Sequence, residues 1–387
     1  MFSFAAFGND LHSGRRSIDF IGRRRLWYLI AGIAVLVSIL SLGIRGLNAG
    51  IEFRGGSEFT VSNVANTSTQ VAEDAVVSAV PGAEQPRVSV VGGNGVRVET
   101  GKLSDQQTNQ VKEALAKAYA VPDTNITSTF VGPSWGQDVT GKAITSLLVF
   151  LALVSLVITL YFRTWTFAVA AIVALLHDLL ITAGIYALIG FEVTPDSVIG
   201  FLTILGYSLY DTVVVFDKVR ENTEHIQATT KRTFAEAANL AVNQTLVRSI
   251  NTSVVALLPV GAILFIGAIL LGAGTLKDLA LALFVGIAAG TYSSIFIATP
   301  LLVELRMREP EMKAQEQRVL KRRREEKERA AEPVLAGVAA AEPVLDAGAT
   351  AVAVEPKREL RQGGGGQRQQ PRRGSGQARN RPGGRRS

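Results

Sequence analysis

The sequence has no cysteine and only three histidines among its 387 residues. The absence of cysteine excludes disulfide bonds and thiolate metal ligands. His12, His177 and His225 are too scattered for a zinc motif, and the GG and GGGG runs lack the strand and helix context of a phosphate-binding loop. We therefore expect no metal and no cofactor. Charge is also scarce, because 19% of the residues are charged and 48% are apolar.

The apolar residues come in long blocks, a composition typical of a membrane protein. A helix needs roughly 20 residues to cross a hydrocarbon core about 30 Å thick. Six blocks reach this length, at residues 26–43, 144–162, 166–190, 197–216, 250–271 and 279–303. No small-residue cleavage site follows the first block, so we expect an uncleaved anchor. The sequence predicts an α-helical polytopic protein with six transmembrane helices, helix 1 at 26–43 and helices 2–6 within 141–303.

Basic residues near the ends of the blocks predict the orientation. Arg15, Arg16 and residues 23–25, all arginine, assign residues 1–25 to the cytoplasm. Six crossings then return the C-terminus to the same side. The loop FEVTPDS, assigned to the outer side, has no basic residue, although Lys277 lies against the trend. We expect a multi-pass protein of the bacterial plasma membrane with both termini in the cytoplasm.

Residues 44–140 are too long and too polar for a loop and predict a folded extracytoplasmic domain. IEFRGGSEFTVSN is interpreted as a strand with Phe53, Phe59 and Val61 alternating. TSTQVAEDAVVSAV has helical spacing, and RVSVVGGNGVRVET is two strands joined by a Gly-Asn-Gly turn. A second helix follows, with Ser104 as N-cap, and NITSTFVG closes as a strand. The order βαββαβ predicts a ferredoxin-like α+β fold.

Residues 304–387 hold half of the lysine and arginine residues and predict a basic, disordered cytoplasmic tail. The stretch MKAQEQRVLKRRREEKERA within it is helix-prone. Two hypotheses for the tail are contact with anionic lipid and contact with ribosomal RNA. The alternative is a solvated extension with neither partner.

Three ionisable residues lie inside the apolar blocks. A charge at the bilayer centre costs about 2.5–3.5 kcal/mol or more, so such residues are functional candidates. His177 and Asp178 fall near the middle of the third block, and Asp211 lies five residues before the end of the fourth. The alternatives are a structural acid that holds helices together, or a neutral imidazole bonded to a neighbouring helix.

A base and a hydroxyl are candidate partners for Asp211. Arg248 lies at the start of the fifth block, at the depth expected for Asp211, and Thr252 is one helical turn further along the same face. An acid paired with arginine stays ionised while paired and takes up a proton when the pair separates. This set predicts a proton relay, whereas the alternative for Arg248 is a positive-inside anchor.

Small residues recur in the fourth and sixth blocks, and they allow helices to approach closely. They are Gly200, Thr203, Gly206, Ser208, Gly286, Ala289, Gly290 and Ser293. The connection at 217–249 has apolar residues at helical spacing. It is either an interfacial amphipathic segment or an ordinary connecting helix.

Four motifs occur in a fixed order along the chain: GIEFRGGSEF, LLHDLLITAG, GYSLYDTVVVFDKVREN and NQTLVRSINTSV. Over about residues 15–305 they make the chain resemble the SecF proteins of the SecD/SecF family, in the resistance-nodulation-division superfamily. The motif residues are Gly50, Glu52, Phe53, Gly55, Gly56, Gly206, Tyr207, Ser208, Asp217, Arg220, Glu221 and Asn222. Two positions depart from the family pattern, because Glu52 stands where Asp is commoner and Tyr210 where Asn is commoner.

The resemblance implies a non-enzymatic role in protein export, driven by the proton motive force after insertion by SecA. It implies SecD as partner, together with the SecYEG channel, SecA and unfolded preproteins, and YajC and YidC-type proteins as further candidates. It places Asp211, Arg248 and Thr252 at the family's proton-linked positions, with Asp178 as the acid of the third span. Two other functions stay open. One is a proton-driven exporter of small molecules or lipids, and the other is a scaffold whose membrane charges only fix assembly.

Overall fold

The computed structural model describes residues 4–92, 94–270 and 277–339. The described residues up to 330 form one compact unit. The predicted disorder of the tail beyond residue 339 lies outside the described residues. The predicted helix within 304–387 is present as α12 (Pro310–Ala339).

Six long apolar helical segments in the described part of the chain confirm the predicted spans: Arg24–Arg45, Ser134–Phe162, Trp165–Ile189, Pro195–Ala228, Phe234–Gly267 and Lys277–Met307. The α-helices in them are α2 (Arg24–Arg45), α6 (Pro133–Phe162), α7 (Trp165–Ile189), α8 (Pro195–Thr223), α9 (Phe234–Gly261), α10 (Lys277–Ser293) and α11 (Thr299–Met307). Two π-helical segments complete them, η3 (Ala262–Leu270) and η5 (Ser294–Ala298). A short helix, α1 (Phe4–His12), precedes the first span.

Helix α9 begins sixteen residues before the predicted span at 250. Its start is fixed by a capping box in which the Thr233 hydroxyl accepts from the Glu236 N–H and the Glu236 carboxylate accepts from the Thr233 N–H. Helix α8 likewise continues to Thr223, and a short 3₁₀ turn, η2 (Ile226–Ala228), follows. Most of the connection predicted at 217–249 is therefore helical and continuous with α8 and α9.

Helices α8 and α10 pack closely because glycine stands at their contact. A Cβ at Gly200 would lie 2.8 Å from the Ala282 Cβ, and one at Gly290 would lie 2.9 Å from the Ser208 Cβ. A Cβ at Gly286 would overlap the Ile204 side chain. Small residues thus bring two backbones together, as their spacing predicted.

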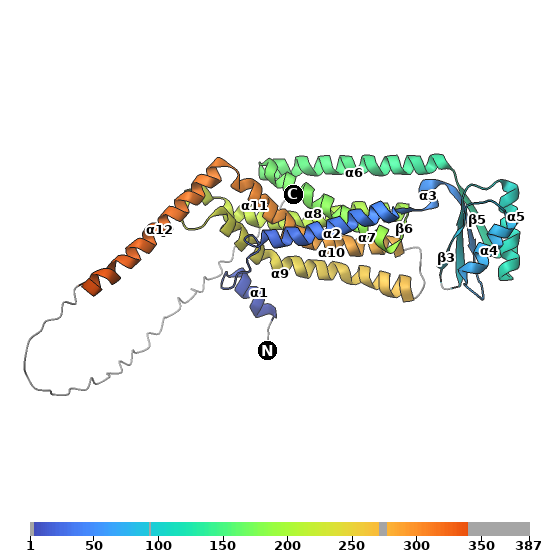
Figure 1. The fold of residues 1–387 in the computed structure, drawn as a ribbon, viewed down its shortest axis with the longest axis horizontal. Coiled ribbons are helices and arrows are strands. Elements are labelled where there is room, and N and C mark those ends of the chain that lie inside the picture. The colour runs from blue at the N-terminus through green and yellow to red at the C-terminus, as the bar shows by residue number, and fades with distance from the viewer. Residues whose placement is uncertain (1–3, 93, 271–276, 340–387) are drawn as a thin grey trace, which may run out of the picture. The chain divides into compact units, whose positions relative to one another are not determined.

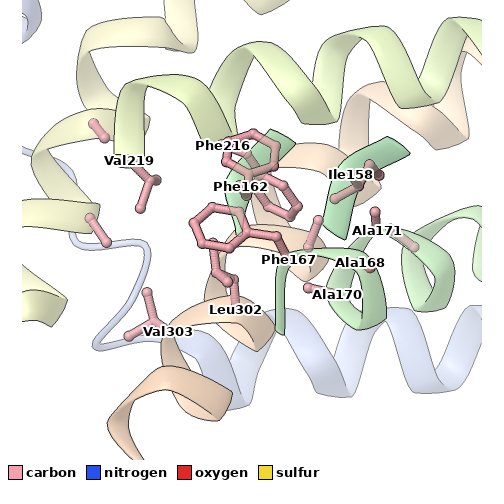
Figure 2. Close-up of a cluster of buried hydrophobic side chains, with 14 of the residues drawn as sticks. Ile158, Phe162, Phe167, Ala168, Ala170, Ala171, Phe216, Val219, Leu302 and Val303 are labelled. Carbon is pink, nitrogen blue, oxygen red and sulfur yellow. The ribbon is translucent and has the colours of Figure 1, made fainter. Parts of the chain in front are cut away.

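Aromatic and aliphatic side chains fill the junction of α6, α7, α8 and α11 (Figure 2). Phe162 and Phe167 stack with ring centroids 4.4 Å apart, and Phe216 meets Phe167 edge-on at 5.2 Å. Each such pair contributes about 0.5–1.5 kcal/mol beyond the buried area. By contrast, α6 exposes apolar side chains along most of its length, including Leu148 and Val157, as a helix facing lipid does.

Residues 56–131 form a sheet domain with the chain order β2 (Gly56–Val61), α4 (Thr69–Ala79), β3 (Arg87–Val91), β4 (Gly95–Thr100), α5 (Asp105–Tyr119) and β5 (Ile126–Val131). A short 3₁₀ turn, η1 (Asp123–Asn125), precedes the last strand. The antiparallel sheet has the order β3-β4-β2-β5. Helices α4 and α5 lie side by side and cover it (Figure 1). The predicted N-cap, Ser104, starts α5 and forms a capping box with Gln107.

A second, two-stranded parallel sheet joins β1 (Asn48–Ala49) to β6 (Glu192–Val193), with Asn48 opposite Glu192. The sequence did not predict this pairing. The strand expected to contain Phe53 is also wrong, because Ile51–Arg54 form a short helix, α3. Gly55 (φ 77°) and Gly56 (φ 153°) end that helix, and the Thr100 carbonyl occupies the space of a Cβ at Gly56. The strand therefore begins at Gly56, and Phe53 packs with the helices instead.

Helix α12 packs its first turns on the connection between α8 and α9. Met312 and Gln315 are buried, and the Gln315 amide donates to the carbonyl groups of Thr229 and Arg232 at 3.3 and 2.8 Å. Arg323 forms a two-pronged contact with Glu236 at 2.7–2.8 Å. The helix that begins the tail is therefore held to the span unit over its first turns.

Candidate functional site: buried acids between three helices

Asp178 is the most enclosed acid of the helical unit, with 1% of its surface exposed. It lies on α7 and reaches both neighbouring helices. The Ser208 hydroxyl of α8 donates to Asp178 Oδ2 at 2.5 Å, and the Ser293 hydroxyl of α10 donates to the same oxygen at 2.8 Å. His177 Nδ1 lies 3.1 Å from Oδ1. Asp178 therefore joins three helices through one carboxyl group.

Asp211 is the second buried acid, with 3% of its surface exposed. It lies on α8, three residues after Ser208, and so on the same helix face. The Ser294 hydroxyl donates to Asp211 Oδ2. The preceding residue, Tyr210, is 55% exposed, whereas Asp211 itself is enclosed.

Neighbouring serines serve the two acids at the end of α10. Ser293 is the last residue of α10, and Ser294 is the first of the π-helical segment η5. Consecutive residues of an α-helix point about 100° apart. The wider π turn changes the local geometry, and such turns are frequent at functional sites. The Thr299 hydroxyl, at the start of α11, donates to the Ser294 carbonyl at 3.1 Å.

Arg248 and Asp211 are not brought together. Arg248 is exposed, and no ion pair joins it to Asp211 within the described ranges. The inward face of α9 is formed by residues such as Thr245, Ser249 and Ser253, all buried, and Arg248 lies one residue out of that phase. Thr252 is one turn beyond Arg248, as expected, but its hydroxyl donates to the Arg248 and Ser249 carbonyls of its own helix.

Two further hydroxyls lie buried next to this site without a hydrogen-bond partner among the described residues. They belong to Thr212, adjacent to Asp211, and Ser249 on α9. Ser253 of α9 accepts from the Thr291 hydroxyl of α10 at 2.6 Å. Hydroxyl groups of α8, α10 and η5 donate to the two acids, and Ser253 links α9 to α10, so polar groups cross the apolar interior.

The GG-containing motif lies where the sheet domain meets the ends of the helices. A Cβ at Gly50 would meet the carboxylates of Glu52 and Glu192. Burial, followed by the nearby carboxyls of Glu99, Glu52 and Asp278, raises the pKa of Glu192 to about 8. Burial also raises the pKa of Glu99. Several acids therefore converge on the β1–β6 junction, although the described residues contain no group of three or more acidic or histidine side chains placed to hold a metal ion.

Some residues of the fourth-span motif contact the buried acids, and others lie on the exposed face of α8 or at its end. Ser208 holds Asp178, whereas Gly206 lies on an exposed face where a Cβ would meet open space, and Tyr207 is half-buried beside it. Further along α8, Asp217 accepts from the Tyr161 hydroxyl at 3.0 Å and Arg220 lies 5.3 Å from the Tyr161 ring.

The end of the same motif forms one side-chain contact within α8 and one with α9. Lys218 contacts Glu221 at 2.6 Å, and the Asn222 amide donates to Gln244 of α9 at 3.0 Å. These contacts support the shape of the helix end and add no acid to the buried site.

Sequence reasoning missed the serine donors as functional residues. Ser208 and Ser293 were interpreted as small packing residues, and Ser294 was not singled out. The sequence did contain a signal, because these serines lie at about the same expected depth in the membrane as the acids. Buried polar groups at that depth need hydrogen-bond partners within the protein. No periodicity distinguishes a serine that packs from one that donates to a carboxylate.

The fold and the site together define a polytopic membrane protein with acids buried in its helical interior. The family model "Protein export membrane protein SecD/SecF, C-terminal" matches residues 110–308, and the model "SecD/SecF GG Motif" matches residues 40–62. The chain belongs to the SecD/SecF family of protein-export membrane proteins and is a multi-pass membrane protein.

Curated relatives and a solved structure agree with this assignment. The chain is 49% identical over 323 residues to protein translocase subunit SecF of Streptomyces coelicolor, covering 84% of this chain and 86% of the relative. It is 48% identical to SecF of Mycobacterium tuberculosis over 330 residues, 82% of this chain and 74% of the relative. The crystal structure of SecDF, a translocon-associated membrane protein from Thermus thermophilus, is similar with a TM-score of 0.66 and 32% identity, over 75% of this chain and 39% of that one.

Proposed function

We propose that this chain is a SecF subunit that works with a SecD subunit and uses the proton motive force to promote late steps of preprotein translocation. The SecYEG channel and the SecA motor are the partners we infer for it, with YajC and YidC-type proteins as further candidates. The observation that carries the proton step is the pair of buried acids, Asp178 and Asp211, linked to neighbouring serines. A charged acid in a membrane interior is energetically costly, so an acid found there is a candidate for a functional role.

The proton step follows from the surroundings of Asp211. A carboxyl group that gains or loses a proton changes charge in a buried place, so its preferred partners change with it. The Ser294 hydroxyl donates to Asp211 Oδ2 and can do so in either protonation state, but it carries no charge of its own. When ionised, Asp211 favours a cation, and Arg248 of α9 is the candidate that the sequence offers. A turn of α9 that exchanges these partners would move the helices. One charge crossing the membrane supplies about 2.3 kcal/mol per 100 mV.

We propose that the sheet domain is a ferredoxin-like extracytoplasmic domain and that both termini are cytoplasmic. The sheet order β3-β4-β2-β5, with one helix after β2 and one after β4, supports the first. The basic residues near the span ends support the second. The short β1–β6 sheet links the domain to the connection between α7 and α8, so it is a route by which helix movement reaches the outer side.

The proposed SecD contact is the exposed face of α8. Ile199, Thr203, Gly206 and Tyr210 share this face, and all four are exposed. Thr203 and Gly206 are small or polar, so the face suits a closely packed helix better than lipid. The solved SecDF chain, of which this chain covers 39%, supplies the reason to expect a second half.

The testing experiment is translocation of a reporter preprotein into inverted membrane vesicles that contain this chain and its SecD partner. Asp211→Asn is compared with wild type and with Glu224→Gln, an exposed acid that follows α8. We expect Asp211→Asn to lose the gradient-stimulated part alone while the complex stays assembled. Unchanged stimulation would move the proton step elsewhere and leave Asp211 as a structural acid, and intact assembly in both variants with no gradient effect in wild type would favour a scaffold.

A further inference from the structure

Strand β3 is an open edge of the sheet domain. It pairs with β4 and with no other strand in the described part of the chain. An edge strand presents unpaired backbone N–H and C=O groups along its outer side. Arg87, Ser89 and Val90 are exposed, and Val90 keeps 48% of its surface accessible. The edge therefore offers a row of donors and acceptors that does not depend on a partner's side chains.

A cavity of about 470 Å³ runs along this edge. All five residues of β3 line it. Its other wall comes from the outer ends of the spans, and the lining residues there are Gly190, Phe191, Glu192, Leu264, Lys277 and Asp278. Phe191 and Leu264 supply apolar surface. Lys277 lies over the Phe191 ring at 4.4 Å, and the remaining charges include both signs.

We propose that this groove binds an extended segment of exported polypeptide by adding it to the sheet as a strand next to β3. The proposal rests on the family's role in protein export and not on the proton step. A protein that handles many exported sequences needs recognition that is nearly independent of side chains, and strand addition supplies it through backbone hydrogen bonds. Side chains of the bound strand alternate between the two faces, so one set meets Phe191 and Leu264 while the other faces solvent.

The composition of the groove suits this occupant. Its charged side chains, Arg87, Arg97 and Lys277 against Glu99, Glu192 and Asp278, nearly balance, so the groove attracts neither strongly acidic nor strongly basic sequences alone. Five residues of strand span roughly 17 Å at about 3.3 Å each. A segment of that length makes several backbone hydrogen bonds with modest total affinity, which suits a chain that must move on.

The other edge of the sheet provides a matched control. β5 also has a single strand partner among the described residues, β2, and its Ser128 is exposed as Ser89 is on β3. The cavity along β3 is not lined by any residue of β5. The two serines therefore report on two edges of one sheet with the same side chain.

The test uses single cysteines, because the chain has none of its own. Ser89→Cys and Ser128→Cys are each placed in the full chain with its SecD partner. A preprotein is halted in the channel by a folded C-terminal domain and carries one cysteine at successive positions. After oxidation, the yield of the disulfide between the cysteine of this chain and that of the preprotein is measured for each position. Arg87→Cys, two residues along the same edge, repeats the measurement if Ser89→Cys does not assemble.

We expect Ser89→Cys to couple to every second position of the halted chain, with a yield several-fold above that of Ser128→Cys. Alternation is the signature of a paired strand. Equal yields at both edges, coupling without alternation, or coupling to the SecD partner in place of the preprotein would each overturn the proposal. If any of these results came with intact gradient-dependent translocation, the proposal that the groove binds the preprotein would fail and the proposed function would stand.

Discussion

Asp178 and Asp211 are linked through consecutive residues of one segment, because Ser293 donates to the first acid and Ser294 to the second. The link passes through the point where α10 changes into the π-helical segment η5. A shift of this turn changes the donors of both acids together. The two acids are therefore joined through one short stretch of backbone in the helical interior.

Removal of either serine hydroxyl should destabilise the helical unit. Ser293→Ala leaves Asp178 with one hydroxyl donor fewer, and an unsatisfied buried group costs about 1–3 kcal/mol. Ser294→Ala removes the hydroxyl donor of Asp211 and should cost a similar amount. Thermal unfolding in detergent measures both. Ser155→Ala is the control, since the Ser155 hydroxyl only donates to the Leu151 carbonyl of its own helix. Equal unfolding temperatures for all three variants would contradict the link.

The core of the sheet domain should depend on Phe59. This side chain is fully buried between the sheet and its helices, and Phe→Ala in a core costs about 3–5 kcal/mol. Phe130, in the neighbouring strand β5, is 54% exposed. We expect Phe59→Ala to raise the protease sensitivity of residues 56–131 strongly and Phe130→Ala to change it little. Similar sensitivity in both variants would show that the sheet contributes no separate core.

The contact at Glu192 should weaken as the pH rises. Its pKa is raised from 4.5 to about 8 by burial and by nearby acids, so the folded protein holds a proton that the unfolded chain has lost. This stability is fully present below pH 4.5 and is lost as the pH rises through about 8. Glu99 on β4, Glu52 on α3 and Asp278 on α10 oppose ionisation, and Arg97 favours that of Glu99.

The measurement is the difference in unfolding temperature between wild type and Glu192→Gln at about pH 5, 7 and 9, which brackets the raised pKa. The wild type should lose stability relative to the variant over this range. Glu113→Gln, an exposed acid on α5, should track the wild type. A difference that is constant with pH would show that Glu192 titrates as an ordinary surface acid.

Two glycines should respond differently to the same change. Gly290→Leu places a side chain against Ser208, and overpacking of this kind costs about 1–3 kcal/mol. Gly206→Leu faces open space and should leave the folded chain intact. If the exposed face of α8 meets SecD, Gly206→Leu should still reduce co-purification of the two subunits. Retained co-purification with Gly206→Leu would place the partner on another face.

Sequence pattern predicted the parts of the fold that depend on local periodicity. The six spans, the order of the sheet domain and the Ser104 cap all have signals within a few residues of the elements themselves. The start of α9 had one too, because Thr233 and Glu236 have capping-box spacing, but the apolar block begins later and determined the predicted boundary. Phe53 was wrongly assigned to a strand, because alternation over a few residues does not show that Gly55 and Gly56 end a short helix before the strand begins.

The remainder depended on contacts between distant parts of the chain. Two residues after the first span pair with two residues before α8, and no local pattern predicts a parallel pair that short. To predict which way Arg248 faces, one must know the rotation of α9 about its own axis to within one residue. That rotation depends on packing against α8 and α10. The three serine donors needed the same information, since their partners lie 30, 83 and 115 residues away.

The β1–β6 sheet has a consequence for how the chain carries load. Only two residue pairs form it, and a backbone hydrogen bond contributes about 0.5–1.5 kcal/mol net. Parallel strands pulled along their length load these bonds side by side, so they resist together and fail together. A joint this small couples the sheet domain to the connection before α8 without welding the two into one rigid body.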